Sequence, residues 1–270
     1  MLLTQTDGTL DAFQNPERKV PTPVTSLKHI ASALPTATRR SSMTREISKG
    51  KSPVISTHSL KTSLVLDFES LKDGDPLLAG TLTANSFHQV VLDQQLKSAG
   101  DKKGLLTKHL SNYCHQLLDH CEEQDRLIIA YSTKELTDLE RITGRRAAHR
   151  YVNALTLAKI WRKRFFPEEH DQVKRFRQRV RQRGNYLGGR GNQLLDFTGL
   201  INIYPPRDYG KGCEAARLRH VLNQLSRRSE YGKLTPVAKA KWTKALKHNE
   251  FDVRALNFLC QRIVSDFGWK

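Results

Sequence analysis

The sequence lacks several features that would place it in a familiar class of protein. No apolar run approaches the roughly 20 residues that a membrane-spanning helix needs. The first residues carry no basic stretch leading into an apolar one, so we expect no secretory signal. The four cysteines include no C-x-x-C pair, which is typical of a reduced protein. We therefore expect a cytoplasmic protein with no membrane partner and no small-molecule cofactor.

Acidic residues are also scarce, because 27 Asp and Glu stand against 45 Lys and Arg, a formal net charge of +18. An excess of this size indicates the partner more than the fold, and the usual partner is a polyphosphate chain. We therefore expect the protein to bind nucleic acid, DNA or RNA. An acidic protein partner is the alternative that the charge leaves open.

Residues 1–60 differ in composition from the rest of the chain. They are rich in Ser, Thr, Pro and Lys and show no sustained hydrophobic periodicity. Such a segment buries too little apolar surface to offset the entropy lost on ordering. We predict a disordered basic tail over 1–60, with an organelle transit peptide as the weaker alternative, and a folded domain over 61–270.

Short apolar runs alternate with helical periodicity through the folded part, which predicts an α/β domain with a mixed sheet of about five strands. The first strand and the fourth are expected to be central and parallel, with the first three forming a meander. The predicted strands are 63–70, 77–84, 86–93, 126–132 and 193–200. The predicted helices are 103–123, one beginning at 133, a basic helical insert over 145–190, 214–228, one beginning at Thr235-Pro236, and 248–267.

The first strand contains two acids, Asp67 and Glu69, within an apolar run. Residues i and i+2 of a strand point to the same face, so the two carboxylates project side by side. Buried like charges are costly unless a counter-charge compensates them, and Mg²⁺ binds through one or two carboxylates. The pair therefore favours a metal site, although a solvated strand end would also explain it.

Two other places carry residues of the same chemistry. Glu135 and Asp138 begin a helix directly after a central strand, where ligands of α/β sheets collect. His248 and Asp252 lie one helical turn apart on the last helix. Each pair also has a simpler explanation, since acids complement a helix N-terminus and an i,i+4 pair can be solvated.

Taken together, these motifs resemble the DEDD-type 3′-to-5′ exonucleases of the ribonuclease-H-like superfamily. The closer resemblance is to predicted RecB-associated nucleases with a YprB-type ribonuclease-H-like domain. Their Y-x-x-x-E-x-x-x-L motif is matched by Tyr131, Glu135 and Leu139, and their Y-N-x-x-D-V run is matched by the sequence from His248 to Val253. The resemblance covers about residues 63–266 in element order.

The resemblance implies a ribonuclease-H-like fold and a two-metal nuclease, expected to be a 3′-to-5′ exonuclease. Asp67, Glu69, Glu135 and Asp252 would hold two Mg²⁺ or Mn²⁺ ions roughly 3.5–4 Å apart. One ion would present a water as hydroxide and the other would stabilise the leaving 3′ oxygen, while His248 would orient the attacking water. Asp138 is the alternative to Glu135 as the acid of the second motif.

The predicted insert is strongly basic, with fifteen Lys and Arg against three acids between 141 and 190. Arg forks grip phosphates bidentately, and aromatics such as Trp161, Phe165, Phe166, Phe176 and Tyr186 can stack on unpaired bases. The candidate nucleic-acid-binding residues are Lys159, Arg162, Lys163, Arg164, Lys174, Arg175, Arg177, Arg179, Arg181, Arg183 and Arg190. Two alternatives remain, a non-catalytic nucleic-acid-binding protein of the same fold and a protein that docks an acidic partner.

Overall fold

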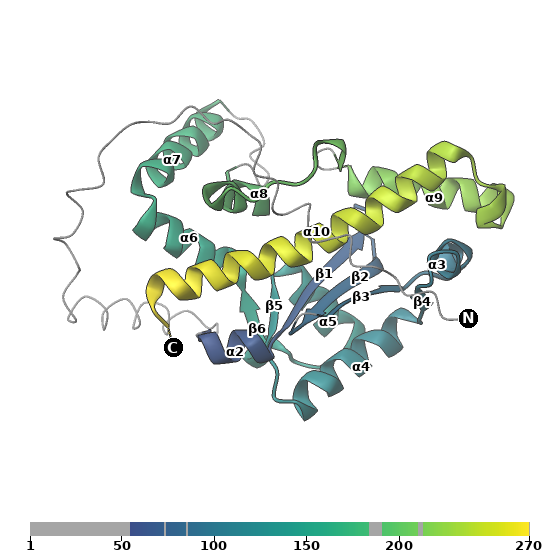
Figure 1. Ribbon diagram of the computed structural model, residues 1–270, viewed down its shortest axis with the longest axis horizontal. Coiled ribbons are helices and arrows are strands. Elements are labelled where there is room, and N and C mark those ends of the chain that lie inside the picture. Colours follow the sequence, from purple (N-terminus) through teal and green to yellow (C-terminus); the bar gives the residue numbers. More distant parts are fainter. Residues whose placement is uncertain (1–54, 73, 85, 184–190, 210–212, 270) are drawn as a thin grey trace, which may run out of the picture. The chain divides into compact units, whose positions relative to one another are not determined.

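A six-stranded mixed sheet forms the centre of the computed structural model, which describes residues 55–72, 74–84, 86–183, 191–209 and 213–269 (Figure 1). The sheet order is β4-β3-β2-β1-β5-β6. β1 pairs antiparallel with β2 and parallel with β5, as the sequence predicts. The strands are β1 Leu64–Ser70, β2 Pro76–Thr83, β3 Ser86–Val91, β4 Leu106–Thr107, β5 Ile128–Ala130 and β6 Tyr151–Asn153.

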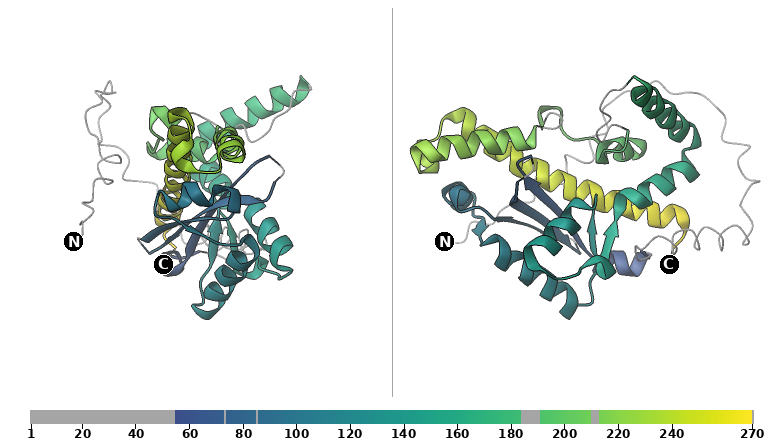
Figure 2. Two further views of the ribbon diagram at one scale, coloured as in Figure 1. Left: turned by 90° about the vertical axis from the view of Figure 1, so that its right-hand side faces the viewer. Right: turned by 180° about the vertical axis from the view of Figure 1, so that it is seen from behind.

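The two faces of β1 have different partners because side chains alternate along a strand. Leu64, Leu66 and Phe68 belong to a core that includes residues of α4 (Leu110–Glu123) and α5 (Lys134–Thr143). Asp67 lies on the opposite face, where α10 (Pro236–Phe267) packs against β1 and β2. The views of Figure 2 show these helices on opposite sides of the sheet.

The helix α10 runs without a break for 32 residues and crosses the sheet face (Figure 1). At 1.5 Å per residue it spans about 48 Å. The predicted cap is present, since the Thr235 side chain accepts a hydrogen bond from the Ala238 N–H and Pro236 follows it. The prediction of a separate last helix from 248 was wrong. No Gly or Pro interrupts residues 237–267, and Gly268 ends the helix in a left-handed conformation.

The basic region after residue 145 is not a single insert. It contributes β6 to the sheet edge, and α6 (Ala154–Phe165) packs against α10, with Trp161 fully buried. Among the α-helices that the structure describes, α7 (Pro167–Gln182) is the one that buries none of its residues. The short strand β6 was missed because three residues carry too little alternation to identify a strand. The sheet has six strands and not about five, because β4 and β6 were not predicted and one predicted strand is a helix.

Two further predictions from periodicity were wrong. Residues 103–109 are not helical, since Gly104 adopts a left-handed backbone and Leu106–Thr107 pair with β3. The predicted strand near 193–200 is instead the helix α8 (Leu194–Thr198), begun by a capping box between Gln193 and Asp196. A short apolar run does not by itself distinguish a strand from a helical turn.

The folded domain begins before the predicted boundary at residue 61. Ile55 is fully buried, and α2 (Thr57–Thr62) starts with a capping box between Ser56 and Ser59. The Thr57 N–H also donates to the backbone oxygen of Trp269, near the C-terminus. The rest of the predicted tail, residues 1–54, lies outside the described residues.

The remaining helices flank the elements already named. Helix α9 (Glu214–Arg228) has the predicted bounds and packs along α10. A further short helix is α3 Lys97–Asp101, and the 3₁₀ turns are η2 Gln94–Leu96, η3 Ala148–Arg150, η4 Gly199–Ile201, η5 Arg207–Tyr209 and η6 Tyr231–Lys233. None of the described helices has both the length and the apolar character that crossing a bilayer requires.

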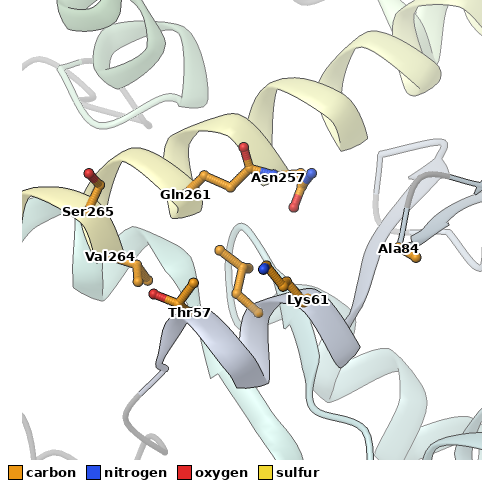
Figure 3. Close-up of a pocket in the computed structure, with 8 residues that line it drawn as sticks. Thr57, Lys61, Ala84, Asn257, Gln261, Val264 and Ser265 are labelled. Atoms are coloured by element: carbon orange, nitrogen blue, oxygen red, sulfur yellow. The ribbon is translucent and has the colours of Figure 1, made fainter. Parts of the chain in front are cut away.

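A surface pocket of about 640 Å³ lies between α2 and α10 (Figure 3). Its lining includes Thr57, Lys61, Asn257 and Gln261 and contains no carboxylate. The acids that the sequence singles out are therefore not in this pocket.

Candidate metal centre

Three of the predicted acids converge where α10 crosses β1. Asp67 and Glu69 come from β1 and Asp252 from the middle of α10, more than 180 positions later in the chain. Each offers a carboxylate oxygen, and these oxygens all lie within 4.8 Å of one another. All three side chains are partly exposed, so an ion can reach them from solvent. Folding thus assembles the first and third motifs into one cluster.

The close approach of α10 to the sheet depends on Gly80. Gly80 is the β2 partner of Asp67, and a Cβ at this position would lie 2.3 Å from the Asn249 side-chain oxygen. The fully buried Asn249 fills this space and donates from Nδ2 to Asp67 Oδ2 at 2.7 Å. Gln89 Nε2 in turn donates to Asn249 Oδ1 at 2.9 Å. A chain of amides from β3 and α10 therefore holds the Asp67 carboxylate in place.

The clustered acids raise one another's pKa. Burial, followed by the charges of Asp252 and Glu135, raises the pKa of Asp67 to about 8. Burial and the charges of Asp67 and Asp252 also hold the pKa of Glu69 well above its ordinary value. Burial raises the pKa of Asp252 despite a hydrogen bond from His248. Ionisation of all three carboxyls at once is therefore unfavourable unless a cation compensates their charge.

The two acids of the second motif have different partners. Glu135 lies outside the group of three, but its charge raises the pKa of Asp67. Its Oε2 accepts a hydrogen bond from Ser132 at 3.0 Å, and Tyr151 Oη lies 3.5 Å away. Asp138 instead accepts from Arg141 at 3.1 Å. Of the two acids, Glu135 is the one whose charge acts on Asp67, whereas Asp138 is paired with cations.

His248 lies at the edge of the cluster and is nearly buried. Its Nε2 is 3.3 Å from Asp252 Oδ2 and 3.0 Å from an oxygen of Glu214, the first residue of α9. Burial disfavours the charged imidazole, but the hydrogen bond to Asp252 and the charges of Asp252 and Glu214 outweigh it and raise the pKa of His248.

Glu214 is the residue that sequence reasoning missed. Its negative charge also raises the pKa of both Glu69 and Asp252, so it is a fifth acid at this place. It belongs to none of the three motifs, and an acid in the first turn of a helix is ordinarily explained by the helix dipole. No pattern in the sequence connects it with β1.

The donor set suits a hard divalent cation. Mg²⁺ and Mn²⁺ prefer carboxylate oxygens, and Mg²⁺ keeps several waters when one or two carboxylates bind it. Asp67, Glu69 and Asp252 present such oxygens close together, and a cation there would offset the burial and the neighbouring negative charges that raise their pKa values. The residues present therefore fit the metal that the resemblance implies.

The predicted nucleic-acid-binding residues have different surroundings. Arg162 is almost fully buried, donates to the Gly191 carbonyl at 2.7 Å and lies over the Phe197 ring, so its predicted role was wrong. Arg190 lies outside the described residues. The exposed members are Lys159, Lys163, Lys174, Arg175, Arg179, Arg181 and Arg183, and Arg164 and Arg177 are partly exposed.

The aromatics of this region serve mainly in packing. Trp161 is buried against Phe166 with ring centroids 4.8 Å apart, and Phe165 packs edge-on against Phe267 at 5.1 Å. Phe176 is 37% exposed on α7. Tyr186 lies outside the described residues. Trp161 is therefore occupied by the protein itself, whereas Phe165, at 38% exposed, keeps part of its surface open to solvent as Phe176 does.

Comparisons with known proteins add no relative. No protein family, no curated protein and no solved structure matches the chain.

Proposed function

We propose that the protein is a divalent-cation-dependent nuclease with a ribonuclease-H-like fold, acting as a 3′-to-5′ exonuclease on DNA or RNA. The observation that carries this proposal is the convergence of Asp67, Glu69 and Asp252 from distant parts of the chain. The element order also supports it, because a three-stranded meander precedes a helix, a central parallel strand and further helices.

The side chains of the cluster would have different roles in phosphodiester hydrolysis. Asp67, Glu69 and Asp252 would hold the Mg²⁺ or Mn²⁺ ions, and Glu135 stands beside Asp67 to complete the set. Bound ions would supply an activated water and neutralise charge on the leaving oxygen. His248 is held at the cluster edge through Nε2, which faces both Asp252 and Glu214; to orient the attacking water, as the resemblance implies, Nε2 would exchange one of these partners for the water.

A basic surface suited to a polyphosphate chain accompanies the cluster. The exposed cations of α7 are Lys174, Arg175, Arg179 and Arg181, and Arg183 follows at its C-terminal end. We call these five residues the α7 basic arm. Arg and Lys on an unburied helix bind phosphates without reading base identity. Because all five residues of the arm are cations and Trp161 is buried, we expect the arm to recognise the phosphate backbone.

The test is cleavage of a 5′-labelled oligonucleotide by the purified protein with Mg²⁺ or Mn²⁺, and its loss on chelation. The Glu135→Gln protein is expected to lose about 10- to 100-fold in activity, the range for groups that support a metal site. Asp138→Asn is its matched control on the same helix and is expected to retain activity, because Asp138 pairs with Arg141. Equal losses in the two variants would remove Glu135 from the site.

A second prediction concerns the α7 basic arm. Replacing its four arginines, Arg175, Arg179, Arg181 and Arg183, by Gln is expected to weaken binding and flatten its salt dependence. Each phosphate that the arm no longer neutralises should reduce the slope of log K against log salt by about 0.7 to 0.9. Fluorescence anisotropy at several salt concentrations measures this slope, with Lys102→Gln/Lys103→Gln as the control for removed charge. An unchanged slope in the arm variant would contradict a role for the arm.

The same experiments separate the competing functions. Salt-dependent oligonucleotide binding without cation-dependent cleavage would indicate a non-catalytic nucleic-acid-binding protein. Displacement of the oligonucleotide by an acidic polypeptide with equal potency would instead indicate an acidic protein partner.

A further inference from the structure

Lys134 is a cation at the rim of the carboxylate cluster that the nuclease motifs do not include. It is the first residue of α5, directly before Glu135, and its side chain is 47% exposed. Its Nζ donates to Ser70 Oγ at 2.7 Å, and Ser70 is the last residue of β1, directly after Glu69. The ammonium group therefore bridges the ends of the two elements that carry Glu69 and Glu135.

The positive charge acts on the cluster itself. Lys134 lowers the pKa of both Glu69 and Glu135, against the stronger effect of burial. The ammonium thus lies close to two of the acids while much of its surface stays open to solvent.

Lys134 also forms an ion pair with Asp138 one turn along α5, and this pair engages only part of its hydrogen-bonding capacity. Asp138 Oδ1 accepts a hydrogen bond from Arg141 at 3.1 Å. Asp138 Oδ2 lies 3.4 Å from Lys134 Nζ. The nearest partner of Lys134 is the neutral Ser70 hydroxyl. The ammonium therefore has hydrogen-bonding capacity to offer an incoming anion, since Lys carries three donors.

A nucleic acid strand that enters the cluster meets five acidic side chains, which repel its phosphates when they are ionised. A phosphate adjoining the scissile bond lies one nucleotide from the ions and needs a cation of its own. We propose that Lys134 binds a phosphate of the substrate next to the scissile phosphodiester and so fixes the strand across the end of β1. This inference rests on the proposed nuclease function and deepens it.

The test combines a change in the protein with a change in single phosphates of the substrate. Oligonucleotides carry one neutral methylphosphonate linkage at successive positions around the cleavage site. Lys134→Gln is expected to lower kcat/KM on the all-phosphate substrate about 10- to 100-fold, the equivalent of one charge-assisted hydrogen bond. At one position the methylphosphonate should lower the activity of the unsubstituted protein by a similar factor and leave Lys134→Gln unaffected.

Two variants control for charge and structure. Lys134→Arg keeps the cation and should restore most of the activity. Lys97→Gln removes a lysine that is likewise paired with an aspartate four residues later, Asp101, but on α3, and should behave like the unsubstituted protein. Thermal unfolding confirms that each variant is folded.

The outcomes separate this inference from the proposed function. Unchanged kcat/KM in Lys134→Gln overturns the inference, and so does a loss that is the same with and without each methylphosphonate. In both cases the unsubstituted protein still cleaves the all-phosphate substrate, so the nuclease function stands. Failure of the unsubstituted protein to cleave any substrate overturns both.

Discussion

The Asp67→Asn protein is expected to lose cation-dependent cleavage by a factor of about 10³ or more and to unfold at a higher temperature at pH 8. Metal ions supply several kcal/mol of transition-state stabilisation, which corresponds to about a thousandfold in rate. Asp67 is one of the three converging acids, and it also accepts the hydrogen bond from Asn249 that links β1 to α10. Removing its charge relieves the repulsion that it shares with the neighbouring acids.

The buried hydrogen bond survives this substitution. Asn249 Nδ2 donates to Asp67 Oδ2 at 2.7 Å, and the amide oxygen of Asn can accept the same bond. Asp93→Asn is the control, because Asp93 caps η2 and Asn caps equally well. Cleavage assays test the expected loss of activity. Thermal unfolding at pH 8 without added metal tests the expected rise in unfolding temperature. Retained cleavage would reject the metal site, and abolished cleavage with a lowered unfolding temperature would indicate a folding defect instead.

Divalent cations are expected to stabilise the protein strongly at pH 8 and little at pH 5.5. The folded-state pKa values of Asp67, Glu69 and Asp252 are raised, to about 8 for Asp67, above the ordinary value near 4. The folded protein therefore binds more protons than the unfolded chain between about pH 4 and 8, and its stability without metal falls as pH rises through this range. A bound cation compensates the ionised carboxylates and so removes this loss of stability.

The expected size follows from ligand linkage. At a cation concentration of about one hundred times Kd, binding stabilises the folded state by about 2.7 kcal/mol, or roughly 5–10 °C for a domain of this size. Differential scanning fluorimetry with and without Mn²⁺ at the two pH values measures the shift. In Asp67→Asn the shift at pH 8 should largely disappear. A stabilisation that is equal at both pH values, or equal in the variant, would place the cation elsewhere.

The effects expected for Asp67→Asn and the pH-dependent stabilisation by divalent cations have one physical cause. Acids that repel each other in a partly buried site destabilise the ion-free protein, and that same arrangement binds a divalent ion and presents it to a phosphate. The amides of Gln89 and Asn249 and the absent side chain of Gly80 keep the acids together against this repulsion.

Local patterns in the sequence were sufficient to predict the strands and the helix start that carry the site. The apolar run around Asp67 and Glu69 predicted β1, the apolar run before Glu135 predicted β5, and the cap at Thr235-Pro236 predicted the start of α10. These predictions hold because alternation and capping act between residues a few positions apart. Periodicity failed for β4, β6 and α8, which are only two to five residues long.

The sequence by itself determined that Asp67 and Glu69 project together from a buried strand, because the pleat of a strand fixes that relation. Only the tertiary structure decided that Asp252 joins them, that the charge of Glu135 acts on Asp67 while Asp138 pairs with Arg141, and that the charges of Glu214 and Lys134 act on Glu69. It also decided that Arg162 is buried whereas the α7 basic arm is exposed. These choices depend on how α9 and α10 pack on the sheet, and packing between segments far apart in the chain leaves no periodic trace in either segment.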